Sequence, residues 1–562
     1  MHLTDFPQLA AYVILLVLLA PPTGRWMGRI LHPAAAGGTS AKWTGRLTDA
    51  ITGRAGRRAM TWRHYLTALL VFNAMGLAGL TALQMTQAWL PGNPAHLPNV
   101  PFPLALNTAI SFVTNTNWQA YSGEATMSYL TQMAGLGVQN FVSAATGLAV
   151  LLALARGMAA SSGTLLGNFW QDLTRGTLFI LLPLSAVLAL LLVSQGVVQT
   201  MEPYAAATTL EGSGQVIPLG PAASQIAVKQ LGTNGGGFFG VNSAHPFENP
   251  TPFSNFLQVF AILLLPAAGI FLFAEITGSR KHGWILFSTM LALLAASFSL
   301  AWWAEMQPDP VLGVSAMMEG KETRFGIMNS VLWSSATTAA SNGSVNAMHD
   351  SLSPLAGGAA LFNIMLGGVI FGGVGAGLYG MLMFVILTVF IAGLMVGRSP
   401  EYLGKRIELK EVGWAVVAVL LPCVVILAGA AVSCQTEPGL SSLTNHGPHG
   451  LSEIVYAWSS AAGNNGSAFA GLSANTPFYH YGLGLAMLLG RFGIIIPVLV
   501  IAGSLAGKKY TPPGPATFPT DGGTFGLLLA SVILVIGGLT FIPVLSLGPI
   551  IEHWIVQAGS AF

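Results

Sequence analysis

Gly232-Thr233-Asn234-Gly235-Gly236 is one of four similar polar segments in this chain, and each segment lies between two long apolar runs. The other three are Val113-Thr114-Asn115-Thr116-Asn117, Ala340-Ser341-Asn342-Gly343-Ser344 and Gly463-Asn464-Asn465-Gly466-Ser467. With Asn117, Gly235, Gly343 and Gly466 taken as equivalent, the separations are 118, 108 and 123 residues (235−117, 343−235, 466−343). One structural module is therefore predicted to occur four times, and a fourfold repeat favours a ring.

The composition of the 562 residues is that of an integral membrane protein. Hydrophobic residues make up 53% and charged residues 7% of the chain, whereas a soluble domain has roughly 25% charged residues. A bilayer core of about 30 Å requires about 20 apolar residues for each helix that crosses it. Ten spans are predicted, near residues 6–26, 64–89, 125–155, 174–198, 252–276, 283–304, 358–397, 412–433, 479–505 and 523–555.

Basic residues predict the orientation of these spans, because cytoplasmic loops retain Lys and Arg. With the N-terminus outside, the cytoplasmic loops lie near 24–63, 156–175, 278–282, 398–410 and 506–510, and they contain 18 of the 22 basic residues. The four others are Lys229, Lys321, Arg324 and Arg491. Both termini and the four polar segments are therefore expected outside. The net charge of +2 does not favour nucleic acid as a partner, so membrane lipids are the expected surroundings.

A shorter apolar segment precedes each polar one, at residues 103–113, 222–232, 325–340 and 451–463. These segments are too short to cross a bilayer, and non-helical backbone at membrane depth is tolerated only inside protein or beside a water-filled cavity. Each repeat is therefore predicted to contain a membrane helix, a short pore helix, an extended filter strand and a second membrane helix.

The predicted fold is an all-α membrane protein with ten transmembrane helices and four membrane–pore–membrane repeats around a pseudo-fourfold pore. Its expected parts are an additional N-terminal span (1–30), a basic cytoplasmic loop (31–63), repeat 1 (64–156), repeat 2 (172–278), repeat 3 with a broken second helix (281–398), repeat 4 (411–506) and an additional C-terminal span (522–556).

The four polar segments are predicted to bind a monovalent cation. Pore helices that point their C-termini at one axis favour a cation, because a helix C-terminus carries roughly half a negative charge. Asparagine side chains and the carbonyl oxygens beside glycine could replace the hydration shell of that cation. None of the segments contains Asp or Glu, whereas divalent sites usually gather carboxylates. The register of the first segment is open, because Asn115 aligns with either Thr233 or Asn234.

The apolar run 359–396 is too long for one straight span. Its 38 residues (396−359+1) would form a helix of about 57 Å, and division into two spans would place the next basic residues outside, against the charge rule. We expect one interrupted crossing below the third filter segment, unwound at Gly367, Gly368, Gly372, Gly373, Gly375, Gly377 and Gly380. A movable loop that obstructs the ion path is one interpretation, and close helix packing by small residues is the other.

Three polar residues near the expected path are further candidates. Arg491 lies 17 residues before Lys508 (508−491), about 25 Å along a helix, so it is expected within the membrane, where an Arg faces a cavity or a partner group. We interpret it as a fixed positive charge that borders the path and opposes free flow; a structural pairing with a carbonyl or carboxylate is the alternative. Gln119 and Glu124 flank the first filter and could tune the outer mouth, although Glu124 also suits a helix N-terminus.

Several long strings of this chain resemble those of the KdpA family, the potassium-translocating A subunits of bacterial Kdp potassium-importing ATPases. The strings are Thr114-Asn-Thr-Asn-Trp-Gln-Ala-Tyr-Ser-Gly-Glu124, Gly232-Thr-Asn-Gly-Gly-Gly-Phe-Phe239, Asn242-Ser-Ala-His-Pro-Phe-Glu-Asn-Pro-Thr251, Tyr402-Leu-Gly-Lys405 and Gly490-Arg-Phe-Gly493. The resemblance covers essentially residues 1–562 and implies a fold of the potassium-transporter superfamily.

The resemblance also implies a function and a set of partners. A protein of this kind binds K⁺ as the transported ion and works with the P-type ATPase KdpB, the single-span protein KdpC and the small protein KdpF in the bacterial inner membrane. The filter positions of the family map onto Asn115, Thr116, Asn117, Thr233, Asn234, Gly235, Ser341, Asn342, Gly343, Asn464, Asn465 and Gly466. The implied ion path runs from this filter into a tunnel toward the P-type ATPase.

The chain has no segment that would supply energy for transport. It contains neither a Gly-x-x-x-x-Gly-Lys-Ser/Thr phosphate loop nor an Asp-Lys-Thr-Gly-Thr segment, so ATP is expected to be used by a partner, and no organic cofactor or catalytic site is expected here. One alternative is a stand-alone Trk/Ktr-type potassium channel or ion-coupled transporter. Another is a membrane-embedded enzyme that uses His245, Glu248 and His349-Asp350.

Overall fold

The computed structural model describes residues 5–31, 39–56, 58–161, 163–512, 514 and 517–560, which form a mostly helical bundle. Residues 1–4 of the predicted first span, and residues 32–38 and Arg57 of the predicted basic loop, lie outside the described residues.

Ten helical segments of the described chain are long and apolar enough to cross a membrane, which confirms the expected number of spans. They are α1 (Asp5–Leu31), α4 (Trp62–Thr86), η2 with α7 (Thr131–Gly137 and Val138–Ala159), α8 with η3 and α9 (Phe169–Gly176, Thr177–Leu181 and Leu182–Ser194), α11 (Pro252–Thr277), α12 (Arg280–Glu305), α15 (Ala376–Met395), α16 (Leu409–Gln435), α19 (Pro477–Ala506) and α20 with η6 and α21 (Gly523–Leu545, Ser546–Ile550 and Ile551–Gln557).

The third span begins later than expected. The predicted start near residue 125 is wrong, because Gly123–Thr126 forms a separate short helix, α6, that ends at extended Met127.

The start of the fifth span is set by local capping. The Thr251 hydroxyl accepts from the N–H of Ser254, and the Ser254 hydroxyl accepts from the N–H of Thr251, so α11 begins at Pro252.

A short helix precedes each of the four polar segments, as the sequence predicts. These helices are α5 (Phe102–Val113), α10 (Ala222–Leu231), α13 (Gly326–Ala339) and α18 (Gly447–Ala462). Each ends directly at its polar segment. A fifth short helix, α14 (Pro354–Met365), precedes α15 and belongs to the interrupted crossing.

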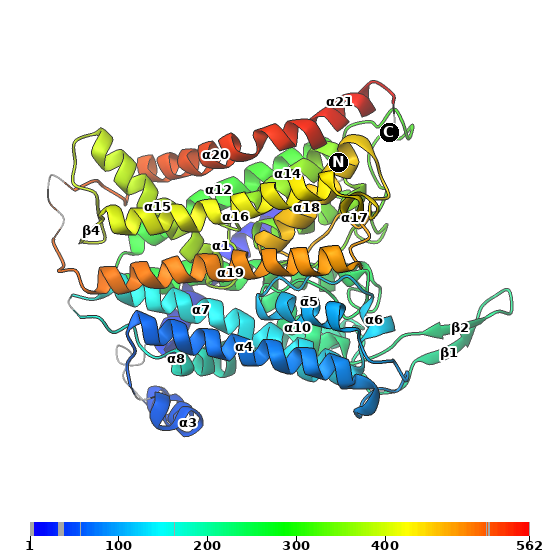
Figure 1. Cartoon of the computed structure of the whole chain (residues 1–562), viewed down its shortest axis with the longest axis horizontal. Coiled ribbons are helices and arrows are strands. Elements are labelled where there is room, and N and C mark those ends of the chain that lie inside the picture. The colour runs from blue at the N-terminus through cyan, green and yellow to red at the C-terminus, as the bar shows by residue number, and fades with distance from the viewer. Residues whose placement is uncertain are drawn as a thin grey trace.

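Figure 1 shows the long helices side by side, with the β1–β2 hairpin (Ala205–Thr208 and Gly214–Ile217) at one end of the bundle and α3 (Thr39–Gly56) at the other. We call these the hairpin end and the α3 end. Both labelled chain ends lie toward the hairpin end, and the β3–β4 ribbon (Glu401–Tyr402 and Lys405–Arg406) lies toward the α3 end.

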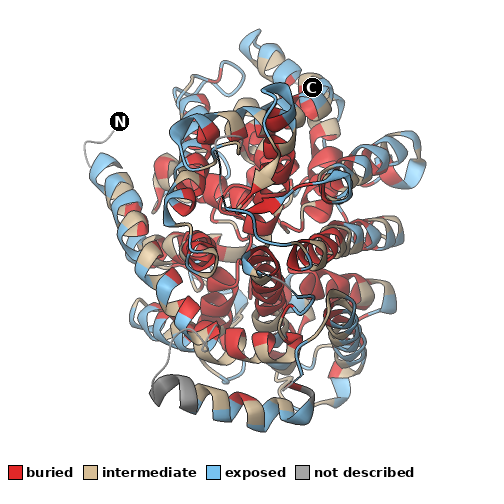
Figure 2. Ribbon diagram, turned by 90° about the vertical axis from the view of Figure 1, so that its left-hand side faces the viewer, coloured by how far each residue is buried: buried red, intermediate tan, exposed pale blue. Residues whose placement is uncertain are grey.

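The core of the bundle surrounds the short helices. In Figure 2, buried residues gather in the middle of the bundle and exposed residues at its rim. In the most apolar part of α7 and of α11, 78% of residues are buried, against 17% for α1 and 28% for the α20 segment. The first and last spans therefore lie at the periphery, as does the span that begins at Trp62, which is also 17% buried; the assignment of the first and last spans as additions to a four-repeat core stays a prediction.

Candidate ion filter and the path beneath it

The backbone of the four polar segments repeats the same hydrogen bond. The N–H groups of Thr116, Asn234, Asn342 and Asn465 each donate to the carbonyl oxygen five residues earlier, at 2.9, 2.8, 3.0 and 2.8 Å. The preceding residues Asn115, Thr233, Ser341 and Asn464 all have positive φ, of 65°, 50°, 51° and 49°. Asn115 therefore corresponds to Thr233, and Asn117 to Gly235, Gly343 and Gly466, which settles the register that the sequence leaves open.

The four segments converge on one axis. A Cβ atom added to Gly235 would lie 2.8, 2.9 and 3.1 Å from the carbonyl oxygens of Thr116, Asn342 and Asn465, which correspond to Asn234 in the other three repeats. A Cβ on Gly466 would lie 2.0 Å from the carbonyl oxygen of Thr116. Glycine is required here because any side chain would fill the space into which carbonyl oxygens of neighbouring strands project.

The asparagine side chains mainly connect the strands to one another. Nδ2 of Asn115 donates to the carbonyl oxygen of Thr233 at 2.9 Å, and Nδ2 of Asn342 donates to that of Asn234 at 3.1 Å. Oδ1 of Asn465 accepts from the Ser467 hydroxyl at 2.5 Å. These contacts engage the amide groups of Asn115, Asn342 and Asn465 with protein atoms, whereas Oδ1 of Asn234 is buried without a hydrogen-bond partner among the described residues. The expectation that asparagine oxygens and backbone carbonyl oxygens bind the ion stays a prediction.

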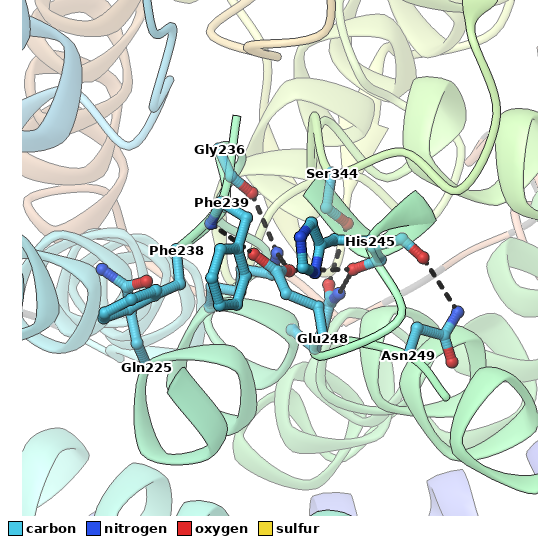
Figure 3. A network of polar contacts seen from close by, with 12 residues as sticks. Gln225, Gly236, Phe238, Phe239, His245, Glu248, Asn249 and Ser344 are labelled. Atoms are coloured by element: carbon cyan, nitrogen blue, oxygen red, sulfur yellow. Dashed lines mark hydrogen bonds and ion pairs between the residues drawn. The ribbon is translucent and has the colours of Figure 1, made fainter. Parts of the chain in front are cut away.

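A buried ion pair supports the second filter strand (Figure 3). Nζ of Lys229 donates to Oε2 of Glu248 at 2.7 Å and to the carbonyl oxygen of Gly236 at 3.0 Å. Oε1 of Glu248 accepts from the backbone N–H of Phe239 at 2.9 Å. Lys229 and Glu248 are 1% and 0% exposed, so water does not solvate their charges. The two charges are instead satisfied by each other and by backbone groups of the filter strand that they hold.

The sequence analysis did not predict this ion pair, although the sequence contains a residue that indicates it. Lys229 is a basic residue in a short apolar segment that the charge rule leaves unexplained. His245 and Glu248, considered above for an enzyme, have packing roles: the His245 ring stacks on Phe239 at 4.0 Å between centroids, and Glu248 binds Lys229.

Gln119 and Glu124 lie beside the filter as expected and join repeat 1 to repeat 2. Oε1 of Gln119 accepts from the N–H of Gly237 at 2.8 Å, and its Nε2 donates to the carbonyl oxygen of Gly237 at 3.1 Å. Oε2 of Glu124 accepts from the N–H of Gly240 at 2.7 Å. Both side chains therefore brace the loop that follows the second filter segment.

The interrupted crossing passes under the second and third filter strands. Residues 366–375 separate α14 from α15 and are not helical. The N–H of Val374 donates to the hydroxyl of Thr233 at 2.9 Å, and a Cβ on Gly368 would lie 3.2 Å from Cβ of Ser341. This loop, which includes Gly372, Gly373 and Gly375, therefore contacts the filter at the side where the pore helices end, and we call this side the lower side of the filter.

Two glycines of the predicted break are helical instead. Gly377 and Gly380 lie inside α15, because the positive φ of Gly375 (77°) ends the loop and α15 begins at Ala376. A Cβ on Gly377 would lie 2.3 Å from Cα of Gly372. Gly377 thus allows close packing of the loop on the helix, as the packing interpretation expects; the interpretation of the loop as a movable obstruction of the ion path stays a prediction.

Arg491 lines a cavity under the filter. The cavity is bordered by Asn115, Ser341, Asn464, Gly373, Tyr379 and Arg491, among others. Nη2 of Arg491 donates to the carbonyl oxygen of Ser143 at 2.9 Å, and Arg491 is 5% exposed. The side chain is thus both paired with a carbonyl group and part of the lining of the cavity next to the filter segments.

Comparison with known families agrees with this geometry. Residues 10–554 match the family model of the potassium-transporting ATPase A subunit, KdpA. The chain belongs to the KdpA family.

Curated relatives cover this KdpA-family chain from end to end. The potassium-transporting ATPase potassium-binding subunit of Leptospira interrogans serogroup Icterohaemorrhagiae serovar copenhageni is 54% identical over 561 residues, which is 100% of both chains. The protein of the same name from Pseudomonas aeruginosa is 60% identical over 497 residues, 88% of each chain. That from Rhodospirillum centenum is 55% identical over 566 residues, 99% of this chain and 98% of the relative.

A solved structure shares the fold. The potassium transporter TrkH from Vibrio parahaemolyticus superposes with a TM-score of 0.52 over 89% of this chain and 95% of its own, at 13% identity. The likeness confirms the potassium-transporter fold that the family resemblance implies. Because the KdpA family is matched at much higher identity over the full length, the family favours a Kdp protein over a stand-alone Trk/Ktr-type transporter.

Proposed function

We propose that this chain is the potassium-binding and translocating subunit of an ATP-driven potassium importer. The observation that supports it most directly is the position of Gly235, whose hypothetical Cβ lies within about 3 Å of carbonyl oxygens from all three other repeats. Backbone carbonyl oxygens gathered around one axis are the groups that replace the hydration shell of K⁺.

The ring is suited to a monovalent cation. The helices α5, α10, α13 and α18 end at the filter, so each contributes the partial negative charge of its C-terminus, roughly half a unit charge. The four polar segments contain no carboxylate. We assign K⁺ binding to Asn115, Thr116, Asn117, Thr233, Asn234, Gly235, Ser341, Asn342, Gly343, Asn464, Asn465 and Gly466, chiefly through their backbone oxygens.

The path below the filter is controlled by the loop 366–375 and by Arg491. The loop is hydrogen-bonded to Thr233 of the filter, and the guanidinium group stands at the cavity beneath. A positive charge in a low-dielectric cavity raises the energy of a nearby cation. An ion therefore leaves the filter only when the loop and the charge allow it, as a coupled pump requires.

In this function the chain carries no catalytic site of its own. ATP is hydrolysed by the P-type ATPase KdpB, and the single-span protein KdpC and the small protein KdpF complete the complex in the bacterial inner membrane. The relatives are named as subunits of a potassium-transporting ATPase, which supports this assembly.

The hairpin end faces outward, with both termini on that side. A cysteine introduced in the hairpin should react with impermeant maleimide in intact spheroplasts, and protection until lysis would reverse the orientation.

The filter assignment is tested with Gly235→Asp in the purified complex. The new carboxylate would enter the carbonyl ring, so K⁺-stimulated ATPase activity should lose its preference for K⁺ over Na⁺. Gly413→Asp is the matched control, because Gly413 lies near the start of α16 with no atom within 4 Å of its hypothetical Cβ. Normal ion preference in Gly235→Asp would contradict the assignment of the filter.

A further inference from the structure

Three chain segments distant in sequence bring acidic and imidazole groups together at the hairpin end. Asp350 follows the third filter segment in η5 (His349–Ser351), and His449 and Glu453 lie in the first turns of the pore helix α18. Glu552 comes from α21. One donor atom each of Asp350, His449 and Glu453 lies within 4.8 Å of those of the other two. None of these side chains contributes to the proposed filter.

The His449 ring is held between two carboxylates. Its Nδ1 lies 2.7 Å from Oε1 of Glu552, and its Nε2 lies 3.3 Å from Oδ1 of Asp350. If Nδ1 donates its proton to Glu552, the lone pair of Nε2 faces a carboxylate oxygen. A histidine oriented by a carboxylate through one nitrogen, with the other nitrogen free to coordinate, is the usual arrangement of a metal-binding histidine.

Glu453 provides the second observation. It is 0% exposed, and its Oε2 has no hydrogen-bond partner among the described residues, whereas its Oε1 accepts from Nδ2 of Asn445 at 2.7 Å. A buried carboxylate oxygen without a partner is costly. A cation bound between Glu453, Asp350 and His449 would satisfy it.

The backbone of Gly471 leaves room only for small groups beside these carboxylates. A Cβ on Gly471 would lie 2.1 Å from Oε1 of Glu453 and 2.7 Å from Oδ2 of Asp350. Both carboxylates therefore border the same small space.

We propose that Asp350, His449 and Glu453 bind a divalent transition-metal ion, with Zn²⁺ as the best match, and that Glu552 positions His449. Zn²⁺ is bound by nitrogen and oxygen donors at about 2.0–2.1 Å in tetrahedral geometry, which places the donors about 3.3 Å apart. The distance of 3.3 Å between Nε2 of His449 and Oδ1 of Asp350 already has this value. A mixed imidazole and carboxylate set favours Zn²⁺ over Mg²⁺ or Ca²⁺, which prefer oxygen donors alone.

The bound ion would tie the loop after the third filter segment to the fourth pore helix. The His449 ring stacks on Phe469 at 5.9 Å between centroids, and Phe469 stacks on Tyr456 at 4.2 Å. The hydroxyl of Tyr456 lies 2.8 Å from that of Ser467, next to the fourth filter strand. The site would therefore hold together the segments that surround the filter at the hairpin end, and it would not contact the proposed ion path.

The test measures metal binding by the full-length protein purified with its partner proteins. After treatment with a chelator and dialysis against Zn²⁺, bound zinc is determined by mass spectrometry and affinity by competition with a chromophoric chelator. We expect one Zn²⁺ per chain and affinity lowered about tenfold or more in Asp350→Asn and in Glu453→Gln. Glu322→Gln is the control, since Glu322 forms a separate pair with Arg324 and should leave binding unchanged.

A second measurement begins with the unmutated complex, so its first result does not depend on the folding of a variant. The zinc X-ray absorption spectrum of the unmutated complex should show nitrogen and oxygen ligands at about 2.0 Å, including an imidazole, and the imidazole signal should disappear in His449→Gln. Zn²⁺ should also raise the thermal unfolding midpoint of the unmutated complex but not of Asp350→Asn. Absence of stoichiometric zinc would mean that only a proton lies between His449 and Asp350, and it would overturn the proposal. Equal zinc affinity in Asp350→Asn would also overturn it, because Asp350 would then not be a ligand.

Discussion

Arg491 and Asn115 are connected through a single residue, Ser143. The carbonyl oxygen of Ser143 accepts from Nη2 of Arg491 at 2.9 Å, and the hydroxyl of Ser143 donates to Oδ1 of Asn115 at 2.8 Å. A charge in the fourth repeat is thereby held beneath a filter residue of the first. This contact explains how one arginine is kept at the inner side of the filter even though it is buried among apolar helices.

Replacement of Arg491 by Gln should increase passive K⁺ movement. In an effective dielectric of about 20, loss of one unit charge beside the path lowers the barrier for a cation by on the order of 1–2 kcal/mol, so flux should rise about tenfold. The measurement is K⁺ flux into liposomes that contain the purified complex without ATP. Arg491→Lys keeps the charge and is the control; equal leak in the Gln variant and the unmutated protein would exclude the charge barrier.

Gly466→Ala should weaken K⁺ binding. The new Cβ would lie 2.0 Å from the carbonyl oxygen of Thr116, and the φ of 101° at Gly466 is unfavourable for alanine, so the strand must move. We expect the K⁺ concentration for half-maximal ATPase stimulation to rise about tenfold or more, equivalent to about 1.4 kcal/mol. Gly413→Ala, in open space, should behave as the unmutated protein. An unchanged K⁺ requirement in Gly466→Ala would show that the carbonyl of Thr116 is not a ligand.

Lys229→Met should destabilise the second filter strand. It leaves Glu248 buried without its partner, at a cost of about 3–5 kcal/mol, whereas Lys229→Met combined with Glu248→Gln removes both charges and should recover most of the loss. Thermal unfolding of the purified complex, analysed as a double-mutant cycle, measures the coupling. If the double variant is as unstable as the sum of the two single variants, the ion pair does not act as a unit.

Gly377→Ala should displace the loop beneath the filter. A Cβ at this position would lie 2.3 Å from Cα of Gly372, a contact that only backbone movement can relieve. We expect a changed rate of K⁺ transport and a smaller change in K⁺ affinity, since the loop contacts the filter through the hydrogen bond from Val374 to Thr233. Gly79→Ala in α4 is the control, because its Cβ would meet no atom within 4 Å. Transport rates are compared in liposomes with ATP; identical rates would argue against a role of the loop in the path.

The sequence alone predicts a large part of the architecture. Hydropathy determines the number of spans because each helix must satisfy its own backbone in lipid, and this requirement is local. The recurrence of a short apolar helix before a polar segment, as at 222–232 and 325–340, likewise predicts the repeats before any contact is known. The interruption of the run 359–396 follows from its length and glycines.

Other features depend on contacts between residues far apart in the chain. The tertiary structure decided that the Asn115 amide group binds Thr233, 118 residues away (233−115), rather than pointing its oxygen at an ion. It placed Gly377 inside α15, where it packs on Gly372. It also paired Lys229 with Glu248 and brought Asp350 to His449, 99 residues later.

The division has a physical reason. Membrane insertion and helix formation respond to the apolar surface and backbone hydrogen bonds of one segment, so residue order is enough to predict them. The direction in which a filter side chain points, and the partner that a buried charge finds, depend on how helices from different repeats pack against each other. For this chain, residue order determined the four modules and the glycines that their ring requires, and only packing decided that backbone carbonyls face the axis while side chains hold the ring together.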